Sequence, residues 1–408
     1  MYSKLRGKTK NKHAHIVLPI IQYNYIVIQM NIGLNGQRIL INNPAGPERF
    51  TINLYRSLAI VDTANRYTIY LSAEPAGFEI EEIFKLNKNF SYKVLSSKYF
   101  WTQRALATEL RRNPPDVFFS PVHTLPFIRS RKTKFIAMIH GLEYKSNKNF
   151  STVSLNKIEH SLLLRWVVNA TDCLIVPSQA TKNALADSGW CRDINKIKII
   201  SEGVAKTFKK YPLADVKKVC SKYALTPDNY LLFISTIQPR KNIPNMVWGF
   251  SKALTQDHSL KKHQLVLVGK PGWNYAESYE APAKYAVEQN VKFLNWVSQE
   301  DIPYLLSGAK LYINTSVEEG FGLTVLEAMA CEIPVIASDI PPYRELGTNL
   351  IEYVDPKDPT DIAEKISLLL SHPYDQKTLS EARSRSAHYS WENTAKNLIS
   401  VIESVHPH

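Results

Sequence analysis

The chain has 408 residues and carries 50 Lys and Arg against 37 Asp and Glu, a formal net charge of +13 at pH 7. This length exceeds that of a usual single hydrophobic core, so we expect two domains. The composition is globular, and the lack of an apolar run of about 18 residues excludes a helix that spans a membrane. The positive charge indicates an acidic partner, for which nucleotide phosphate, anionic lipid and nucleic acid are the candidates.

The four cysteines are Cys173, Cys191, Cys220 and Cys331, and they show neither a C-x-x-C pair nor metal-ligand spacing. Such cysteines are typical of reduced, buried thiols in the cytoplasm. We therefore expect a cytoplasmic protein, either free or peripheral on the inner face of the membrane.

Residues 1–29 consist of a basic run followed by an apolar run at 16–28, an order typical of a signal peptide. The polar tripeptide at 22–24 interrupts the apolar run, and no small-residue cleavage site follows it. We predict that residues 1–29 are a leader outside the fold, so that a chain beginning at Met30 is equally heat-stable. A tail that touches the membrane is the alternative.

Residues 30–207 alternate short apolar runs with helical patterns, which is typical of a doubly wound parallel sheet. The expected strands are 31–35, 67–72, 90–95, 116–120, 135–139, 173–178 and 196–203, and the expected helices are 51–58, about 102–112 and a segment from Gln179. We predict an N-terminal Rossmann-like domain that binds its ligands at the carboxyl ends of the strands.

Two residues of this half are candidates for a ligand site because they follow predicted strands. Gly46 lies in the turn before the first helix, although a plain strand–helix connection would look the same. His140 ends a buried strand in the turn His140-Gly-Leu-Glu143. A lone histidine is more often structural, but its place beside a glycine at a strand's carboxyl end favours a role in a cleft.

A basic stretch runs from residue 85 to residue 134, with eleven Lys and Arg against two acids, Glu109 and Asp116. Phe100 and Trp101 lie within it. Basic and aromatic residues together suit an anionic membrane surface that carries a lipid-linked acceptor, although a solvated face gives the same pattern. We expect no nucleic-acid partner, because the sequence shows neither a reading helix nor regularly spaced stacking aromatics.

Residues 208–228 are polar and mixed and are interpreted as a linker with an approaching helix. Residues 229–388 repeat the alternation of strands and helices. The strands expected there are 230–235, 264–269, 291–297, 310–315 and 334–338. We predict a C-terminal Rossmann-like domain, followed at 389–408 by an amphipathic helix that begins after Ser390.

Arg240 and Lys241 follow the first strand of this half in the turn Pro239-Arg-Lys-Asn242. Two adjacent cations can pair with two phosphates at once, Arg through its planar fork and Lys as a point charge. We expect both side chains to be exposed in an open cleft, so that replacing them leaves the fold unchanged.

The stretch 316–331, S-V-E-E-G-F-G-L-T-V-L-E-A-M-A-C, joins a predicted strand to a predicted helix. Its two glycines let the backbone approach a ligand, and Thr324 with Glu327 fits the Ser/Thr-x-x-Glu pattern of a helix N-terminus. A strand, a glycine turn and a helix start together predict an anion site. Glu319 and Glu327 can each bind hydroxyl pairs on either side of a diphosphate, which predicts a nucleotide-sugar site.

This stretch resembles the E-x7-E signature of the retaining glycosyltransferases of family 4, in which the glycines, the apolar positions and both acids agree together. Pro239-Arg-Lys-Asn242 resembles the diphosphate clamp of the same family. Thr324 stands where the family usually has Pro, and Glu332 where it usually has Gly. The resemblance implies an α/β protein of the GT-B fold, with two Rossmann-like domains facing each other across a cleft and a last helix that crosses back to the first domain.

The resemblance also implies the roles of the site residues. Glu319 orients the sugar, His140 faces the donor sugar, and Arg240 with Lys241 stabilises the leaving diphosphate. The resemblance further implies a set of donor-binding residues, which include the glycine loop before the first helix and the backbone that holds the base. They are Gly46, Gly269, Val297, Gly320, Phe321, Gly322, Leu323 and Glu327.

The activity implied is transfer of a hexose, with retention, from a nucleotide-diphosphate sugar to a glycan or lipid-linked acceptor in polysaccharide biosynthesis. GDP-mannose is the favoured donor and UDP-sugars are the alternative. We expect no cofactor and no metal, because no Asp-x-Asp element follows a predicted strand. The alternative function is a GT-B protein that binds a sugar nucleotide without transfer, such as an epimerase or an inactive relative.

Overall fold

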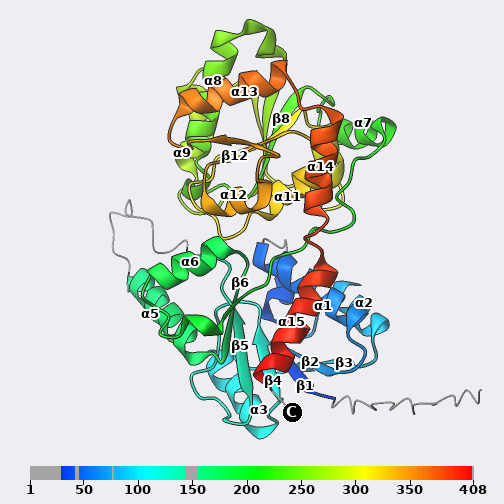
Figure 1. Cartoon of the computed structure of the whole chain (residues 1–408), viewed down its shortest axis with the longest axis vertical. Helices are drawn as coiled ribbons and strands as arrows, with labels where there is room; N and C mark the ends of the chain where they lie inside the picture. Colours follow the sequence, from blue (N-terminus) through cyan, green and yellow to red (C-terminus); the bar gives the residue numbers. More distant parts are fainter. Residues whose placement is uncertain (1–28, 42–45, 76–77, 143–154, 407–408) are drawn as a thin grey trace, which may run out of the picture.

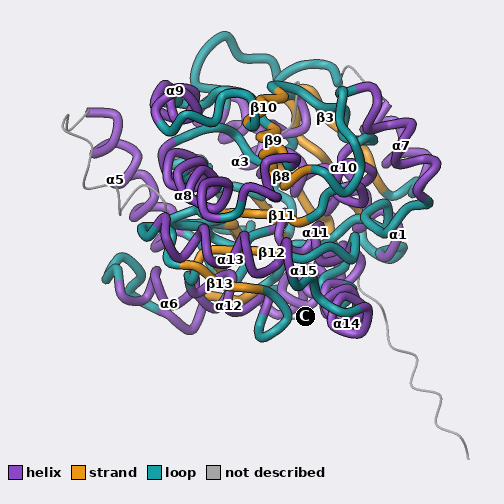
Figure 2. The backbone as a smooth tube through the Cα atoms, turned by 90° about the horizontal axis from the view of Figure 1, so that it is seen from above, coloured by secondary structure: helices purple, strands orange, loops and turns teal. Residues whose placement is uncertain are grey.

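The computed structural model describes residues 29–41, 46–75, 78–142 and 155–406. Two lobes each hold a parallel sheet with helices packed around it (Figure 1), and the view from above shows strands between layers of helices (Figure 2). This arrangement confirms the α/β, GT-B prediction. The predicted leader at 1–29 lies almost wholly outside the described residues. Within the described residues, no helix combines the length and apolarity needed to cross a bilayer.

The first sheet has the strand order β3-β2-β1-β4-β5-β6-β7, with every neighbouring pair parallel. Its strands are β1 Asn31–Asn35, β2 Arg66–Leu71, β3 Phe90–Val94, β4 Val117–Ser120, β5 Lys134–Met138, β6 Cys173–Val176 and β7 Ile197–Ile199. Its helical segments are η1 Gln37–Leu40, α1 Gly46–Val61, α2 Phe78–Leu86, η2 Thr102–Leu106, α3 Ala107–Arg112, α5 Leu155–Ala170, α6 Gln179–Asp187 and η3 Ile194–Lys196.

The second sheet has the order β10-β9-β8-β11-β12-β13 and is also parallel. Its strands are β8 Tyr230–Ile234, β9 Gln264–Val268, β10 Val291–Leu294, β11 Leu311–Asn314, β12 Val335–Ser338 and β13 Glu352–Val354. Its helical segments are α7 Leu213–Lys222, η4 Pro239–Lys241, α8 Ile243–Gln256, η5 His258–Lys262, α9 Ala276–Lys284, α10 Ile302–Gly308, α11 Leu323–Ala330, α12 Pro341–Gly347, α13 Pro359–Ser371 and α14 Gln376–Ser386.

Continuous apolar runs produce the central strands. Every residue of β4, β6, β8, β11 and β12 is buried, as expected for parallel strands covered on both faces. The edge strand β3 instead exposes three consecutive residues, from Ser91 to Lys93. The four cysteines are buried and unpaired, as predicted.

The last helix, α15 Trp391–Val405, packs on α1 of the first lobe although α14 belongs to the second (Figure 1). Its apolar stripe joins the core that contains Phe50, Leu54 and Leu58. Ser390 caps the helix, its hydroxyl accepting a hydrogen bond from the amide of Asn393 at 3.2 Å. The predicted crossing of the last helix is therefore observed.

Candidate functional site

The centre of the site is Glu319, which lies between the two cations of the Pro239–Lys241 turn. Arg240 Nη1 donates to Glu319 Oε2 at 2.6 Å, and Lys241 Nζ donates to Glu319 Oε1. Arg240 Nη1 also donates to the carbonyl of Glu318 at 3.1 Å, and Tyr343 Oη to Glu319 Oε1 at 3.4 Å. The turns that follow β8 and β11, neighbouring strands of the second sheet, therefore meet through one carboxylate.

The prediction that the Arg240 and Lys241 side chains are exposed is wrong. The Arg240 side chain is 16% exposed and the Lys241 side chain 6% exposed. Their pairing with Glu319 explains the burial, because a buried charge requires a close partner of the opposite sign. Both residues consequently support the structure of the turn as well as facing the site.

Burial alone would raise the pKa of Glu319, but the adjacent Arg240 and Lys241 outweigh it and lower that pKa to about 2. Glu319 is therefore a carboxylate at neutral pH. The three side chains together carry a formal charge of +1, which favours an anionic ligand. In the described part of the chain, no cluster of three or more His, Cys, Asp or Glu is arranged as a metal site.

The second acid, Glu327 of α11, is buried to 1% exposure and pairs with a residue of the other lobe. Arg49 Nη2 of α1 donates to Glu327 Oε1 at 2.5 Å. Glu327 Oε2 is also buried and has no hydrogen-bond partner among the described residues. Burial raises the pKa of Glu327, with Arg49 opposing that rise and Glu202 adding to it. A ligand hydroxyl that donates to Oε2 would satisfy this acceptor.

His140 has both ring nitrogens engaged within the first lobe. Nε2 lies 2.9 Å from the carbonyl oxygen of Pro121, and Nδ1 lies 3.0 Å from Glu202 Oε1. Nε2 carries a proton, because a carbonyl oxygen can only accept. The ring also packs edge-on against Phe50, with centroids 4.9 Å apart. The predicted contact of His140 with the donor sugar stays a prediction.

The glycine turn of the second lobe lies directly on the first lobe. A Cβ atom at Gly320 would overlap the carbonyl of His140, so only glycine allows this approach. The hydroxyls of Ser178 and Thr181 donate to the carbonyl of Gly320 at 2.7 and 2.8 Å. The structure thus brings the two predicted elements, the His140 turn and the Glu319 turn, into contact across the lobes.

A second contact joins the same surfaces. The carboxylate of Glu345 on α12 accepts from the amides of Gln179 and Ala180 at the start of α6, at 3.1 and 3.3 Å. Free amides at a helix start favour such a charge. No sequence pattern predicts a place in the site for Arg49, Thr181, Glu202 or Glu345. Ser178 has a visible signal, because it is the serine before a predicted helix.

The predicted capping role of Thr324 is wrong. Gly322, with φ of 118°, precedes the first residue of α11, so the helix begins at Leu323. Thr324 therefore lies inside the helix, where its hydroxyl accepts a hydrogen bond from Tyr312 at 2.7 Å. The ring of Tyr343 fills the space where a side chain at Gly322 would lie. The left-handed glycine, not a capping side chain, starts the helix.

The remaining predicted donor residues occupy different environments. Gly46 is the exposed first residue of α1. Gly269 follows β9 with φ of 151°, and a side chain there would overlap the carbonyl of Ser235. Val297 and Phe321 are buried in the core of the second lobe, and Leu323 is partly buried against it. Their contacts with a donor stay predictions.

Glu332, which stands where the family usually has Gly, adopts φ of 54°. Its carboxylate is held by Arg383 at 2.7 Å and by Gln376 at 2.9 Å. The position after α11 therefore keeps the left-handed conformation that glycine favours, at a cost of about 1 kcal/mol for a residue with a side chain.

Glu332→Gly is expected to change the free energy of unfolding by less than about 1 kcal/mol. Relief of the left-handed conformation offsets the loss of the pair with Arg383, which solvent screens in part because the Arg383 side chain is 62% exposed and the Glu332 side chain 12% exposed. Glu332→Val is expected to destabilise by about 1–3 kcal/mol, because a branched side chain tolerates this conformation least. Urea unfolding measures both. Equal losses in the two variants would show that the carboxylate, not the backbone, matters there.

Two family models match the chain, one over each lobe. The description "Glycosyltransferase Family 4" matches residues 44–207, and "Glycosyl transferases group 1" matches residues 218–386. The second match contains Arg240, Lys241, Glu319 and Glu327, and the first contains Gly46 and His140.

Similar proteins agree with these matches. The Escherichia coli O-antigen chain mannosyltransferase B is 29% identical over 46% of this chain and 49% of its own length. The Salmonella typhimurium O-antigen chain mannosyltransferase RfbU is 28% identical over 58% of this chain and 60% of its own length, so the matched stretches span about half of these relatives. The structure of Anabaena Alr3699/HepE in complex with UDP and glucose has a TM-score of 0.71 at 19% identity, covering 92% of this chain and 100% of that one. The protein belongs to the glycosyltransferases of family 4, and its two Rossmann-like lobes form the GT-B fold.

Proposed function

We propose that this protein is a glycosyltransferase that moves a hexose from a nucleotide-diphosphate sugar to a glycan or lipid-linked acceptor. The observation that carries the proposal is the carboxylate of Glu319 held between Arg240 and Lys241, beside the contact between the two lobes. GDP-mannose is the favoured donor, because the relatives named above are mannosyltransferases. The glucose and UDP bound to the Anabaena protein keep UDP-sugars as the alternative.

Arg240 and Lys241 would bind the diphosphate of the donor. The charge of +1 that remains after Glu319 is paired attracts phosphate, and charge-assisted hydrogen bonds from Arg and Lys are among the stronger ones in proteins. As the bond between the sugar and the diphosphate breaks, negative charge accumulates on the leaving phosphate beside these cations. We propose that they carry this charge themselves, with no metal ion and no cofactor.

Glu319 would act on the sugar. Its carboxylate is ionised, and we propose that it stabilises the positive charge that develops at the anomeric carbon of the donor sugar. We propose transfer with retention: the bond from the anomeric carbon to the phosphate oxygen breaks while the acceptor oxygen bonds to that carbon from the same face. The acceptor's hydroxyl proton passes to the leaving diphosphate.

Glu327 would bind the ribose of the donor through Oε2. Glu327→Gln is expected to weaken GDP binding about tenfold, the cost of one hydrogen bond to a charged group. Arg49→Met is expected to weaken it in the same direction, because Arg49 fixes the orientation of Glu327. Calorimetric titration with GDP measures both, and Glu352→Gln, a partly buried acid paired with Lys365, is the matched control. Unchanged affinity in Glu327→Gln would remove Glu327 from the donor site.

The test of donor class is a thermal-shift comparison of GDP, UDP and ADP with the full chain. The proposal expects a rise in melting temperature with GDP that exceeds those with the other two, because a ligand that binds only the folded state stabilises it. A larger rise with UDP would select the alternative donor. No rise with any of the three would contradict both the transferase and the non-transferring sugar-nucleotide binder.

A further inference from the structure

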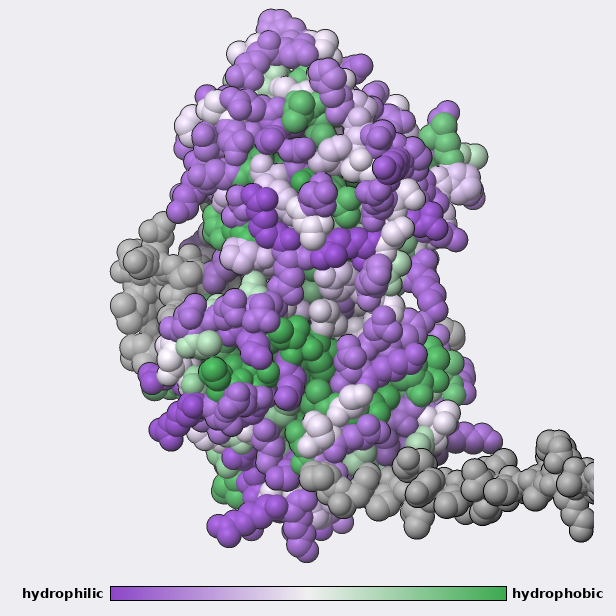
Figure 3. Space-filling view, in the orientation of Figure 1, coloured by the Kyte–Doolittle hydropathy of each residue, from purple (hydrophilic) through white to green (hydrophobic). Residues whose placement is uncertain are grey.

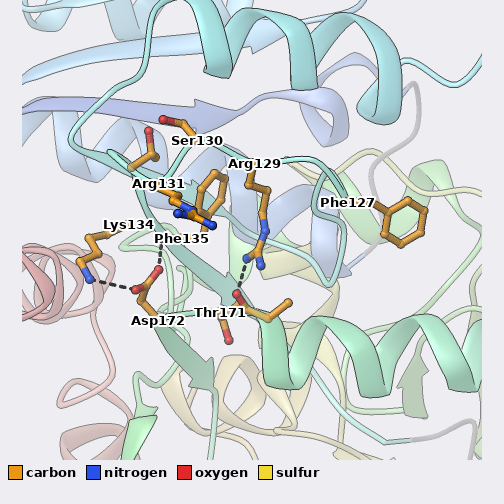
Figure 4. A pocket seen from close by; sticks show the side chains of 10 residues that line it. Phe127, Arg129, Ser130, Arg131, Lys134, Phe135, Thr171 and Asp172 are labelled. Atoms are coloured by element: carbon orange, nitrogen blue, oxygen red, sulfur yellow. Dashed lines mark hydrogen bonds and ion pairs between the residues drawn. The ribbon is translucent and has the colours of Figure 1, made fainter.

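A pocket lies in the first lobe, at the end of the sheet opposite the candidate site. It is about 380 Å³ in volume and is found where β5 and β6 begin, near the end of α5 (Figure 4). The side chains that give it its chemical character are Phe127, Arg129, Arg131, Thr133, Lys134 and Asp172. None of these residues belongs to the donor site described above.

The charges of this pocket favour an anion. Arg129 is fixed in place: it donates to the carbonyl of Ala170, and its guanidinium lies 5.4 Å from the ring of Trp166. Lys134 pairs with Asp172 at 3.1 Å, whereas Arg131 is exposed and makes no ion pair with any described residue. Three cations and one acid leave a formal charge of +2.

A buried hydroxyl points to the same conclusion. Thr133 is 4% exposed, and its Oγ1 has no hydrogen-bond partner among the described residues. Buried polar groups in proteins almost always have a partner, so this hydroxyl calls for one. An anionic oxygen in the pocket would accept its hydrogen bond.

Exposed apolar side chains lie beside the pocket and on the adjoining loop. Phe127 and Ile128 are 56% and 61% exposed, and Tyr99 and Phe100 are 61% and 73% exposed. Phe100 adopts φ of 53°, a left-handed conformation that is uncommon for a bulky residue. Figure 3 shows apolar side chains at the surface of this lobe among hydrophilic ones.

One glutamine holds these two loops together. The side-chain amide of Gln103 donates to the carbonyl of Leu125 at 3.1 Å, and its oxygen accepts from the amide of Phe127 at 2.7 Å. The amide of Gln103 in turn donates to the carbonyl of Phe100 at 2.9 Å. The expectation that Trp101 shares this surface is wrong, because Trp101 is 8% exposed and its Nε1 donates to the carbonyl of Leu95.

We propose that the loops 98–104 and 125–134 form a docking surface for an anionic lipid bilayer. The exposed aromatic and aliphatic side chains enter the boundary between headgroups and acyl chains, and the pocket takes a lipid phosphate. Exposed cations surround these side chains and complement the anionic headgroups. They are Lys98, Arg104, Arg131, Lys132 and Lys134. Apolar anchors combined with surface cations are what such a membrane binds. A nucleic acid would use the cations but not the aliphatic Ile128.

The experiment is flotation of the full chain with vesicles of phosphatidylglycerol and phosphatidylcholine, compared with pure phosphatidylcholine. Wild type is expected to float with the mixed vesicles only, and less so as salt is raised. Arg131→Gln with Lys132→Gln is expected to weaken binding about 30-fold, at about fivefold per cation. Phe127→Ser with Ile128→Ser is expected to weaken it at least about tenfold.

Matched controls separate this surface from general charge and apolarity. Lys261→Gln with Lys262→Gln removes two exposed cations of the second lobe, and Ile60→Ser removes one exposed aliphatic side chain of α1. Both are expected to float as wild type does. Circular dichroism melting establishes that each variant is folded. If the variant with Arg131→Gln and Lys132→Gln does not fold, Arg131→Lys is the alternative, because it keeps the charge.

Four results would overturn the proposal. Equal flotation with neutral and anionic vesicles would remove the role of charge. Wild-type flotation of the Phe127 and Ile128 variant would remove the apolar anchors. Binding of a single-stranded RNA oligonucleotide that the same cation variant abolishes, without vesicle binding, would assign the surface to nucleic acid. Stabilisation by inorganic phosphate without any vesicle binding would assign the pocket to a soluble anion.

Discussion

Glu319→Gln is expected to lower kcat about a hundredfold or more while GDP binds at least as tightly as it does to wild type. The loss follows because only contacts that strengthen in the transition state raise kcat, and the proposed role of the ionised carboxylate is to stabilise charge developing on the sugar. GDP affinity is maintained because the neutral amide leaves Arg240 and Lys241 with their full charge, raising the formal local charge from +1 to +2.

The measurement is donor turnover at saturating donor together with calorimetric titration of GDP. Glu352→Gln, which changes a partly buried acid paired with Lys365, is the control and is expected to behave as wild type does. Poor GDP binding combined with normal turnover at saturation would show that Glu319 supports the nucleotide and not the reaction.

Arg240→Ala and Lys241→Ala are each expected to weaken donor binding about ten- to a hundredfold, the cost of a charge-assisted contact to phosphate. Both are also expected to lower stability, because each leaves Glu319 buried with only one cation. The sequence alone suggested an unchanged fold, and burial of these side chains reverses that expectation. Urea unfolding and GDP titration of each variant measure the two effects. Near-wild-type turnover would remove the cation pair from the donor site.

The pH dependence of stability provides a second readout for Lys241→Ala. The pKa of Glu319 is lowered from 4.5 to about 2 by its two cations, which overcome the opposing effect of burial. The stabilisation is therefore complete above pH 4.5 and is lost as pH falls toward 2. The difference in unfolding free energy between wild type and variant should be largest near neutral pH and shrink in acid. A difference independent of pH would show that packing, not charge, is lost.

The fold could be predicted from the sequence because its strands are continuous apolar runs with clear limits. The predicted strand at 31–35 coincides with β1, and the one at 310–315 contains β11. The three-residue strand β13 was missed, because Glu352–Val354 is too short to form a run. Helix starts were less accurate: α1 begins at Gly46, five residues before the predicted start at residue 51.

The second sheet's part of the site could be predicted because its residues are close in sequence within two short motifs. The contacts between the two lobes could not be predicted. Arg49 and Glu327 are separated by 278 residues and Ser178 and Gly320 by 142, and no local pattern indicates that such residues meet. Two predictions were wrong for a related reason. Arg240 was predicted to be exposed but lies partly buried in its pair with Glu319, a tertiary partner. Thr324 was predicted to cap α11, but the left-handed Gly322 begins that helix.

Transfer of a hexose from a nucleotide-diphosphate sugar is the activity that we propose for this protein. The most direct measurement is release of GDP from GDP-mannose by the full chain, with and without mannose-containing oligosaccharide acceptors, beside the same reactions with UDP-glucose. The proposal predicts release that an acceptor accelerates, that yields a new retained glycosidic bond, and that falls about a hundredfold or more in Glu319→Gln. Tight nucleotide binding without release from either donor, or release that Glu319→Gln leaves unchanged, would contradict it.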